Sequence, residues 1–313
     1  MRTFTKWTDL GTDDKGAAVA IGNFDGVHIG HQAVIDIART EAAKTGAPLG
    51  ILTFEPHPRQ VFAPTAPPFR LMSAEGKANR LEKLGVDHLY QIEFNRDLSS
   101  LTPEEFARDV IKNGFVLSHI VVGDDFCFGK SRAGNAADLV RFGAEMGFGV
   151  TLSKLIETQG REVSSTNIRN ALSDGNPRDA AAMLGHWHRI DGPVIHGEKR
   201  GRTLGFPTAN MSIAGLHPPK FGVYAVKVDV LGGPHTGTYD GAASLGIRPM
   251  FGENQANLET FIFDFEGDLY DTHLSVALVD FLRPEMKFDG LETLKEQMDT
   301  DCDRAKAILA DVA

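Results

Sequence analysis

The stretch AAVAIGNFDGVHIGHQAVI, residues 17–35, leads from an apolar run through a glycine-rich turn into a helix-forming run. A buried strand that passes through glycines into a helix is the first half of a β–α unit, the building block of parallel sheets. The free N–H groups and positive potential at the start of such a helix favour a bound phosphate. The stretch therefore predicts an α/β fold with an anion site at the carboxyl end of its first strand.

The pattern of strand and helix continues to about residue 185. Thr102, Pro103 and Glu105 form a capping box with proline at the first helical position. Asn135 precedes another helix, which is expected to stop near Gly147. Further strands are expected in four apolar runs, at residues 48–54, 87–94, 119–126 and 149–156. This alternation predicts a Rossmann-like parallel sheet with helices on both faces.

The second part of the chain has a different pattern. After Gly185, short strand-like runs follow one another through Gly- and Pro-containing turns, and no helix is expected before residue 291. Consecutive short strands of this kind predict an antiparallel sandwich or barrel. Residues 291–312 form one amphipathic helical pattern. We therefore predict two domains, residues 1–185 and 186–313.

The composition restricts the classes of partner. The 313 residues carry 32 Lys and Arg against 42 Asp and Glu, a net charge of −10, and no basic stripe that would bind nucleic acid. The two cysteines, Cys127 and Cys302, stand far apart, which favours a reducing compartment over a disulfide framework. The N-terminus lacks the apolar core of a signal peptide, and no apolar run is long enough to span a membrane. We expect a cytoplasmic protein without membrane or nucleic-acid partners.

The tetrapeptide His-Ile-Gly-His at residues 28–31 is typical of proteins that bind ATP and transfer its adenylyl group. It occurs in aminoacyl-tRNA synthetases and in small nucleotidyltransferases. His28 and His31 stand three residues apart, so both imidazoles can share one face of the helix entry and contact phosphates. A metal pair is less favoured, because no further ligand stands nearby at suitable spacing, and capped core histidines would not require the surrounding glycines.

The segment VSSTNIRNAL, residues 163–172, follows the last predicted strand and enters a helix. Ser165 and Thr166 offer hydroxyls at the helix start and Arg169 lies one turn further on, an arrangement that suits a triphosphate tail. Taken alone, Ser165 or Thr166 would more often be a helix cap. GDDFCFGKS, residues 123–131, nearly matches a phosphate-binding P-loop, but its spacing and its two bulky phenylalanines argue against one.

A second candidate site opens the C-terminal part, at HGEKRGRTLGFPTANM, residues 196–211. Gly201 and Gly205 lie in a cationic loop fit to cover phosphates. Thr208 and Asn210 supply hydroxyl and amide oxygens two residues apart, which are suitable hard ligands for Mg²⁺ carried by ATP. Glu259 is placed at the start of a predicted strand, where a glutamate by itself would usually only be solvated.

Four motifs of the N-terminal part, GNFDGVHIGH, TFEPHP, GDDFCFGKSRAG and VSSTNIR, together resemble the FMN adenylyltransferase half of bacterial bifunctional riboflavin kinase/FAD synthetases. No KMSKS-like loop of the synthetases is present. The resemblance implies that His28 and His31 contact the ATP phosphates. Cys127 departs from the family, which often carries Arg there. The resemblance further implies that Asn23 and Asp25 shape the loop, that Ser165, Thr166 and Arg169 hold the tail phosphates, and that Pro56, Pro58, Phe62, Asp125 and Phe128 line the flavin side.

The C-terminal motifs GRTLGFPTAN, GVYAV, SLGIRP, LETFIFDF and FLRPEMKF resemble the riboflavin kinase module, a six-stranded barrel closed by a C-terminal helix. The resemblance implies that Thr208 and Asn210 bind Mg-ATP. It also implies that Glu259 is the catalytic base and that Arg283 lies near the flavin. Two residues depart from the family pattern, Met250 and Phe261.

Together the two resemblances imply a bifunctional enzyme that phosphorylates riboflavin to FMN and adenylylates FMN to FAD, using Mg²⁺ and two molecules of ATP. One alternative is a nucleotidyltransferase for another phosphate substrate, such as phosphopantetheine or nicotinamide mononucleotide. Another is a flavin-binding sensor with a degenerate kinase barrel. The oligomeric state is left open.

Overall fold

The computed structural model describes residues 1–8, 10–154, 157–158, 161–196, 205–247 and 256–312. The chain forms two compact units. The first contains residues 1–66 and 77–163, and the second contains residues 67–76 and 164–313. Within the described residues, no helix has the length and apolarity needed to cross a membrane.

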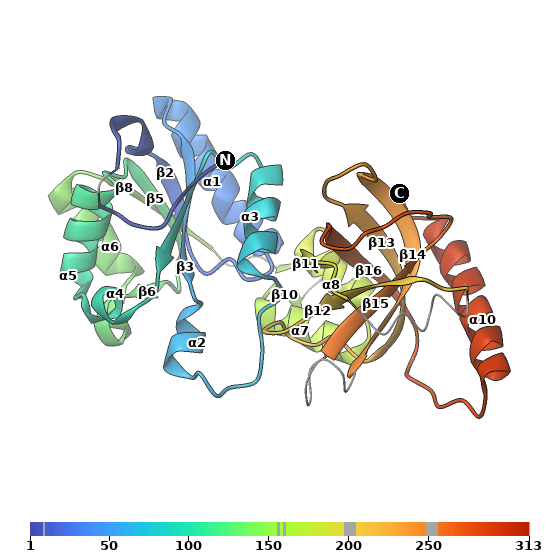
Figure 1. Cartoon of the computed structure of the whole chain (residues 1–313). Helices are drawn as coiled ribbons and strands as arrows, with labels where there is room; N and C mark the ends of the chain where they lie inside the picture. The colour runs from blue at the N-terminus through green and yellow to red at the C-terminus, as the bar shows by residue number, and fades with distance from the viewer. Residues whose placement is uncertain (9, 155–156, 159–160, 197–204, 248–255, 313) are drawn as a thin grey trace. The chain divides into compact units, whose positions relative to one another are not determined.

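The first unit is built on a six-stranded sheet in which every neighbouring pair is parallel, in the order β1-β4-β3-β2-β5-β8 (Figure 1). The predicted α/β architecture is confirmed. The edge strand β1 is an addition that its short, polar sequence did not predict. The strands are β1 (Arg2–Phe4), β2 (Ala18–Ile21), β3 (Leu49–Glu55), β4 (His88–Glu93), β5 (His119–Gly123) and β8 (Gly149–Ser153).

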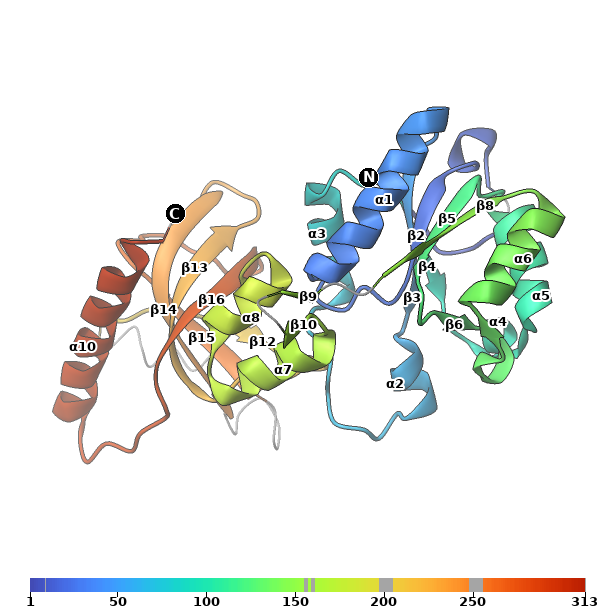
Figure 2. The same ribbon diagram turned by 180° about the vertical axis from the view of Figure 1, so that it is seen from behind.

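Helices lie on both faces of this sheet, with α1 on one face and α6 on the other (Figures 1 and 2). The buried residues of the α6 face form one hydrophobic cluster that also includes much of η2, a π-helix. The helices are α1 (Ile29–Thr45), α2 (Pro58–Phe62), α3 (Ala74–Lys83), α4 (Arg96–Ser100), α5 (Pro103–Glu105), η2 (Phe106–Gly114) and α6 (Ala136–Met146). Short 3₁₀ turns are η1 (Thr12–Asp14) and η3 (Lys130–Arg132), and two-stranded ribbons pair β6 (Cys127–Phe128) with β7 (Gly134–Asn135) and β9 (Glu157–Thr158) with β10 (Arg161–Glu162).

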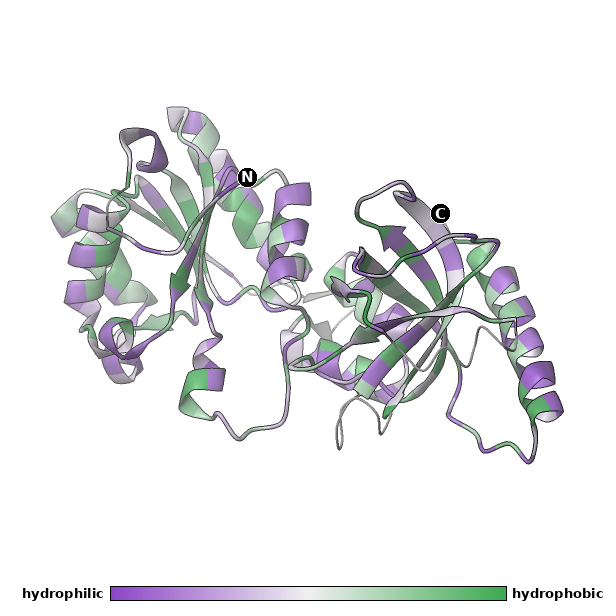
Figure 3. Cartoon of the chain, in the orientation of Figure 1, coloured by the Kyte–Doolittle hydropathy of each residue, from purple (hydrophilic) through white to green (hydrophobic). Residues whose placement is uncertain are grey.

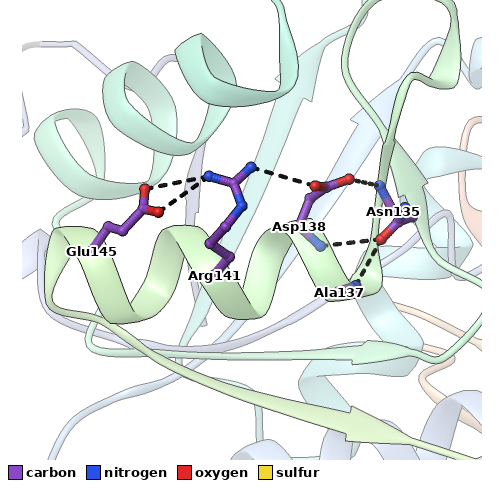
Figure 4. Close-up of polar contacts among 5 residues, drawn as sticks. All are labelled: Asn135, Ala137, Asp138, Arg141 and Glu145. Atoms are coloured by element: carbon purple, nitrogen blue, oxygen red, sulfur yellow. Dashed lines mark hydrogen bonds and ion pairs between the residues drawn. The ribbon is translucent and has the colours of Figure 1, made fainter.

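The predicted helix signals are present. The capping box of Thr102 and Glu105 starts α5, although the helix continues in π rather than α form. Asn135 caps α6 through its Oδ1, which accepts the N–H groups of Ala137 and Asp138 (Figure 4). Further along the helix, Arg141 forms ion pairs with Asp138 and Glu145. Gly147 ends α6 in the left-handed conformation, at φ 80°, which glycine adopts without steric cost.

The second unit contains a six-stranded antiparallel sheet in the order β11-β16-β13-β14-β15-β12. A further antiparallel bridge between Ile195 and Asn210 joins the two ends, with a 2.8 Å hydrogen bond from Ile195 N to Asn210 O. The predicted barrel is thereby confirmed. Its strands are β11 (His188–Pro193), β12 (Thr208–Ser212), β13 (Gly222–Val230), β14 (Gly237–Ile247), β15 (Ala256–Ile262) and β16 (His273–Arg283).

The C-terminal helix α10 (Leu291–Leu309) packs on the outside of this barrel through Ala305 and Leu309. Hydrophobic and hydrophilic residues are interspersed along it, as expected of a helix with one buried face (Figure 3). Inside the barrel, a second cluster is formed by the alternate residues of the strands, among them Met211, Val226 and Leu258. The barrel wall therefore has an apolar lining and a partly polar outer face.

Two more helices, α7 (Ser165–Asp174) and α8 (Pro177–Leu184), belong to this second unit. Arg178 of α8 pairs with Asp280 of β16 at 2.8 Å. Lys220 N donates to the carbonyl of Leu172 at 2.9 Å, which ties α7 to the segment before β13. By its contacts the second compact unit thus includes residues 164–185, which lie ahead of the sequence boundary expected at 185/186.

Candidate active sites

The first candidate site is the loop between β2 and α1. Two residues that are not glycine, Phe24 and Val27, adopt positive φ angles of 51° and 43°, and Gly26 has φ 90°. Left-handed backbone at a β-branched residue is rare, and such strain is concentrated at functional sites. The loop delivers His28 to the N-cap of α1, where its Nδ1 accepts the N–H of His31 at 3.3 Å.

His28 and His31 lie against each other, as their spacing predicted. Their rings stack with centroids 3.6 Å apart and planes 17° apart, and the ring of Phe24 packs on His31 at 5.1 Å. Burial, followed by His28 and then Lys77, holds the pKa of His31 well below its ordinary value. His31 is therefore neutral at pH 7, and its imidazole can donate one N–H to a phosphate oxygen. Gly30 leaves room for the pair, since a Cβ there would lie 3.1 Å from His28 Nδ1.

A buried cation supports this loop, and the sequence did not predict it. Lys77 Nζ lies 2.8 Å from Glu55 Oε1 and donates to Thr53 Oγ1 at 3.0 Å and to the carbonyl of Asn23 at 3.3 Å. A lysine in the polar helix α3 would be expected in solvent. The only available signal was the acidic residue of TFEPHP at the end of a buried strand, which requires a partner.

The predicted phosphate-tail residues lie at the start of α7, in the second unit. Ser164, rather than Ser165 or Thr166, is the N-cap, and its Oγ accepts the N–H of Asn167 at 3.2 Å. Thr166 and Arg169 lie one turn apart, with Arg169 Nη2 donating to Thr166 Oγ1 at 3.3 Å. The hydroxyls of Ser165 and Thr166 are thus in the first turn, where a helix attracts anions.

Of the residues predicted for the flavin side, Pro56, Pro58 and Phe62 lie at the carboxyl end of β3, whereas Asp125 and Phe128 follow β5. Pro56 precedes α2, and Phe62 at its end is 71% exposed, with its edge on Phe94 at a centroid distance of 5.6 Å. Asp125 is exposed, whereas Phe128 is buried and packs in the core against Phe106 and Phe126.

The near-match to a P-loop is not one in the structure. Residues 127–135 form the β6–β7 ribbon with the short turn η3, and the next helix begins only at Ala136.

The second candidate site lies on the outer wall of the barrel. In the antiparallel register, Glu259 of β15 stands between Asn210 of β12 and Ser244 of β14. Thr208 stands opposite Phe261 in the same ladder. Because alternate residues of a strand share a face, all five side chains are on one face of the sheet. The structure thereby brings together the three polar residues that the sequence proposed, and it adds Ser244.

The side chain of Asn210 is held by a hydrogen bond from the neighbouring strand β15. Asn257 Nδ2 donates to Asn210 Oδ1 at 2.9 Å, and both side chains are buried. Glu259 is half-buried in the middle of β15 rather than at its start. Gly205 precedes β12 with φ 87°, a conformation that favours glycine. Two further sequence expectations, Gly201 and Met250, lie outside the described residues.

Arg283, predicted near the flavin, ends β16 and contacts α10. Its Nε and Nη2 form a two-pronged pair with the buried carboxylate of Asp301, at 2.7–3.0 Å, and Gln297 Nε2 donates to the same carboxylate at 2.9 Å. In the structure this guanidinium therefore joins the barrel to its helix.

The residues of the second site fit a hard divalent cation. Thr208 contributes a half-buried hydroxyl and Asn210 an amide oxygen, the donor types that Mg²⁺ prefers. Asn257 Oδ1 is buried beside them and has no hydrogen-bond partner among the described residues. A cation brought by ATP would find oxygen donors here.

Comparison with known proteins accounts for both units. The FAD synthetase family model matches residues 11–167 and the riboflavin kinase family model matches residues 184–309. The bifunctional riboflavin kinase/FMN adenylyltransferase of Pseudomonas fluorescens is 40% identical over 303 residues, covering 96% of each chain. The protein of the same description from Listeria monocytogenes is 38% identical over 98% of this chain and 96% of its own.

A crystal structure described as a macrolide-efflux protein from Streptococcus pneumoniae has the same fold. It covers 100% of this chain and 99% of its own, with a TM-score of 0.83 and 30% identity. The two family matches and the relatives of nearly equal length agree, and the chain belongs to the family of bifunctional riboflavin kinases/FMN adenylyltransferases.

Proposed function

We infer that this chain phosphorylates riboflavin to FMN and then adenylylates FMN to FAD, with ATP as donor in both steps. The observation that carries the kinase assignment is the register that places Glu259 beside Asn210 on the barrel wall. The stacked histidines at the N-terminus of α1 carry the adenylyl assignment. Family membership supports both, and it disfavours a sensor or a nucleotidyltransferase for another phosphate.

In the adenylyl step, the phosphate of FMN attacks the α-phosphorus of ATP and diphosphate leaves. The attacking phosphate is already ionised, so the protein has to position it and stabilise charge rather than remove a proton. We assign His28 and His31 to the phosphates that gain charge, and Ser165, Thr166 and Arg169 to the leaving diphosphate. Asn23 and Asp25 shape the loop, and the flavin ring is assigned to Pro56, Pro58, Phe62, Asp125 and Phe128.

In the kinase step, the ribityl 5′-hydroxyl attacks the γ-phosphorus of ATP and ADP leaves. A hydroxyl is a poor nucleophile at neutral pH, so a base is needed. Glu259 takes that role. Thr208 and Asn210 would hold Mg²⁺, which when bound would stabilise negative charge on the phosphates of ATP. The loop of Gly201 and Gly205 covers the phosphates. Arg283 acts near the flavin through the end of β16 that it anchors.

The domain boundary at 185/186 and a cytoplasmic location complete the proposal. The boundary is supported by the family matches, of which the second starts at residue 184. The location is supported by the two isolated cysteines, neither of which forms a disulfide.

The substitution Glu259→Gln tests the kinase assignment, because it keeps size and hydrogen bonding and removes the base. FMN formation at saturating substrates should fall by about 10²–10⁴-fold, whereas FAD formation from added FMN should continue. The exposed Glu266, just beyond the same strand, provides the matched control Glu266→Gln. A Glu259→Gln enzyme that makes FMN at the wild-type rate would remove this residue from the mechanism.

A further inference from the structure

Lys77 is a fully buried lysine outside every motif that the sequence singled out. Its side chain is 1% exposed, although it stands on α3, whose other residues include several exposed charges. An ammonium group loses strong hydration on burial, so it is retained in a core only where oxygen atoms surround it. The contacts of its Nζ are with the loop between β2 and α1 and with strand β3.

Those contacts converge on one backbone carbonyl. Lys77 Nζ donates to the carbonyl of Asn23, and Thr53 Oγ1 donates to the same oxygen at 3.2 Å. Nζ also donates to Thr53 Oγ1, and Glu55 Oε1 balances the charge at 2.8 Å. The peptide between Asn23 and Phe24 is thus fixed by two donors from the neighbouring elements β3 and α3.

This peptide is where the loop first turns into left-handed backbone. Phe24, the residue that follows the anchored carbonyl, has φ 51°, and its buried ring packs on His31. Val27, just before His28, has φ 43°. Strained backbone of this kind persists only where the surroundings hold it. Release of the carbonyl would let Phe24 relax and would move the surface on which His31 rests.

We propose that Lys77 is a positioning residue for adenylyl transfer, which fixes the loop of residues 22–27 through the carbonyl of Asn23 and so sets the two histidines at the start of α1. Its charge also acts on His31, since Lys77 is among the causes that lower the pKa of that ring. Lys77 acts through the loop, by way of the carbonyl of Asn23. The proposal rests on the proposed role of His28 and His31.

The test measures FMN adenylylation in the full-length protein. Lys77→Met keeps the length of the side chain and removes the charge. We expect kcat to fall by about 10–100-fold, because small displacements of catalytic groups cost this much, while KM for FMN and ATP changes by less than about threefold. Lys77→Arg, which keeps a cation, should recover part of the loss. Lys83→Met, on the same helix but exposed, should match the wild type.

Two readouts separate positioning from a contribution to stability alone. The pKa of His31, followed by NMR titration of its ring, should rise in Lys77→Met and stay unchanged in Lys83→Met. Riboflavin phosphorylation by the second unit should be unaffected in both. If Lys77→Met does not fold, Thr53→Val decides, because it keeps the lysine and the shape of the core and removes one of the two donors to Asn23.

The outcomes are distinct. A folded Lys77→Met with kcat within about twofold of wild type, or a Thr53→Val with the same result, overturns the proposal. A loss confined to KM for FMN also overturns it, since it would place Lys77 in flavin binding. His31→Asn is assayed alongside. If His31→Asn retains full activity, the histidine assignment itself fails, whereas a loss in His31→Asn with full activity in Lys77→Met overturns only the role of Lys77.

Discussion

At the scale of single residues, the first site is a stacked pair of imidazoles, and burial lowers the pKa of one of them, His31. His28 caps α1 and stacks on His31, and His31 Nδ1 is buried without a hydrogen-bond partner among the described residues. Uncompensated buried nitrogens are unusual in folded proteins and are explained where a ligand completes them. A phosphate oxygen at the helix N-terminus would supply what the protein leaves open.

The histidine pair gives a prediction that separates the two activities. His31→Asn keeps a hydrogen-bonding side chain but loses the stacked ring, so charge on the reacting phosphates is less well stabilised. We expect FAD formation from FMN to fall by about 10²–10³-fold, the loss typical of one stabilising donor. FMN formation from riboflavin should stay at the wild-type rate, as should both rates in the control His235→Asn. Equal loss of both activities in His31→Asn would contradict separate sites.

Residues within motifs could be predicted from the sequence, whereas the residues that hold them in place could not. The spacing of His28 and His31 predicted their shared face. The motif GRTLGFPTAN singled out Thr208 and Asn210, which strand pairing places on the outer wall of the barrel. Lys77 could not be predicted, because its burial depends on Thr53 and Asn23, which are distant in the sequence. Asn257 was missed for the same reason, since its hydrogen bond to Asn210 arises from strand pairing.

At the scale of elements, strands and caps followed the local pattern, and deviations came from tertiary packing. Gly147 ends α6 as predicted, and Gly46 ends α1 in the same left-handed conformation. The helix that begins at Pro103 turns into a π-helix, which no periodicity in a single sequence reveals. Strand β1 and helix α3 were missed because neither has a clear apolar pattern, and both are held by the neighbours on which they pack.

Strand β11 contains a buried histidine that should make the second unit sensitive to acid. Burial, followed by His186 and His217, lowers the pKa of His188 to about 3. The unfolded chain takes up a proton below the ordinary pKa of about 6.5, whereas the folded chain does so only near 3. Folding stability is therefore lost as the pH falls from about 6.5 toward 3, by about 2 kcal/mol at pH 5.

The measurement is urea unfolding at pH 7 and pH 5, followed by the fluorescence of Trp187 in a Trp7→Phe background, so that the second unit is observed. The loss of unfolding free energy between these pH values should be smaller in His188→Leu by about 2 kcal/mol. An identical loss in both proteins would show that His188 does not resist protonation in the folded state.

At the scale of the whole molecule, one chain combines two folds, and we propose a different reaction for each. The change from alternating strands and helices to consecutive strands predicted two folds, and both are present. The boundary between the two compact units could not be predicted, because no feature in the sequence of α7 or α8 assigns these helices to the unit that contains the barrel. Their contacts with β16 and with the segment before β13 do so.

The central claim is that each site performs one reaction by itself. FMN made by one protein molecule can then be adenylylated by another, so the two damaged proteins should complement each other. Glu259→Gln should make little FAD from riboflavin because it lacks FMN, and His31→Asn should accumulate FMN. An equimolar mixture of the two, given riboflavin, ATP and Mg²⁺, should form FAD at a rate far above the sum of the separate rates. A mixture that forms no more FAD than that sum, although each protein retains its other activity, would contradict the account.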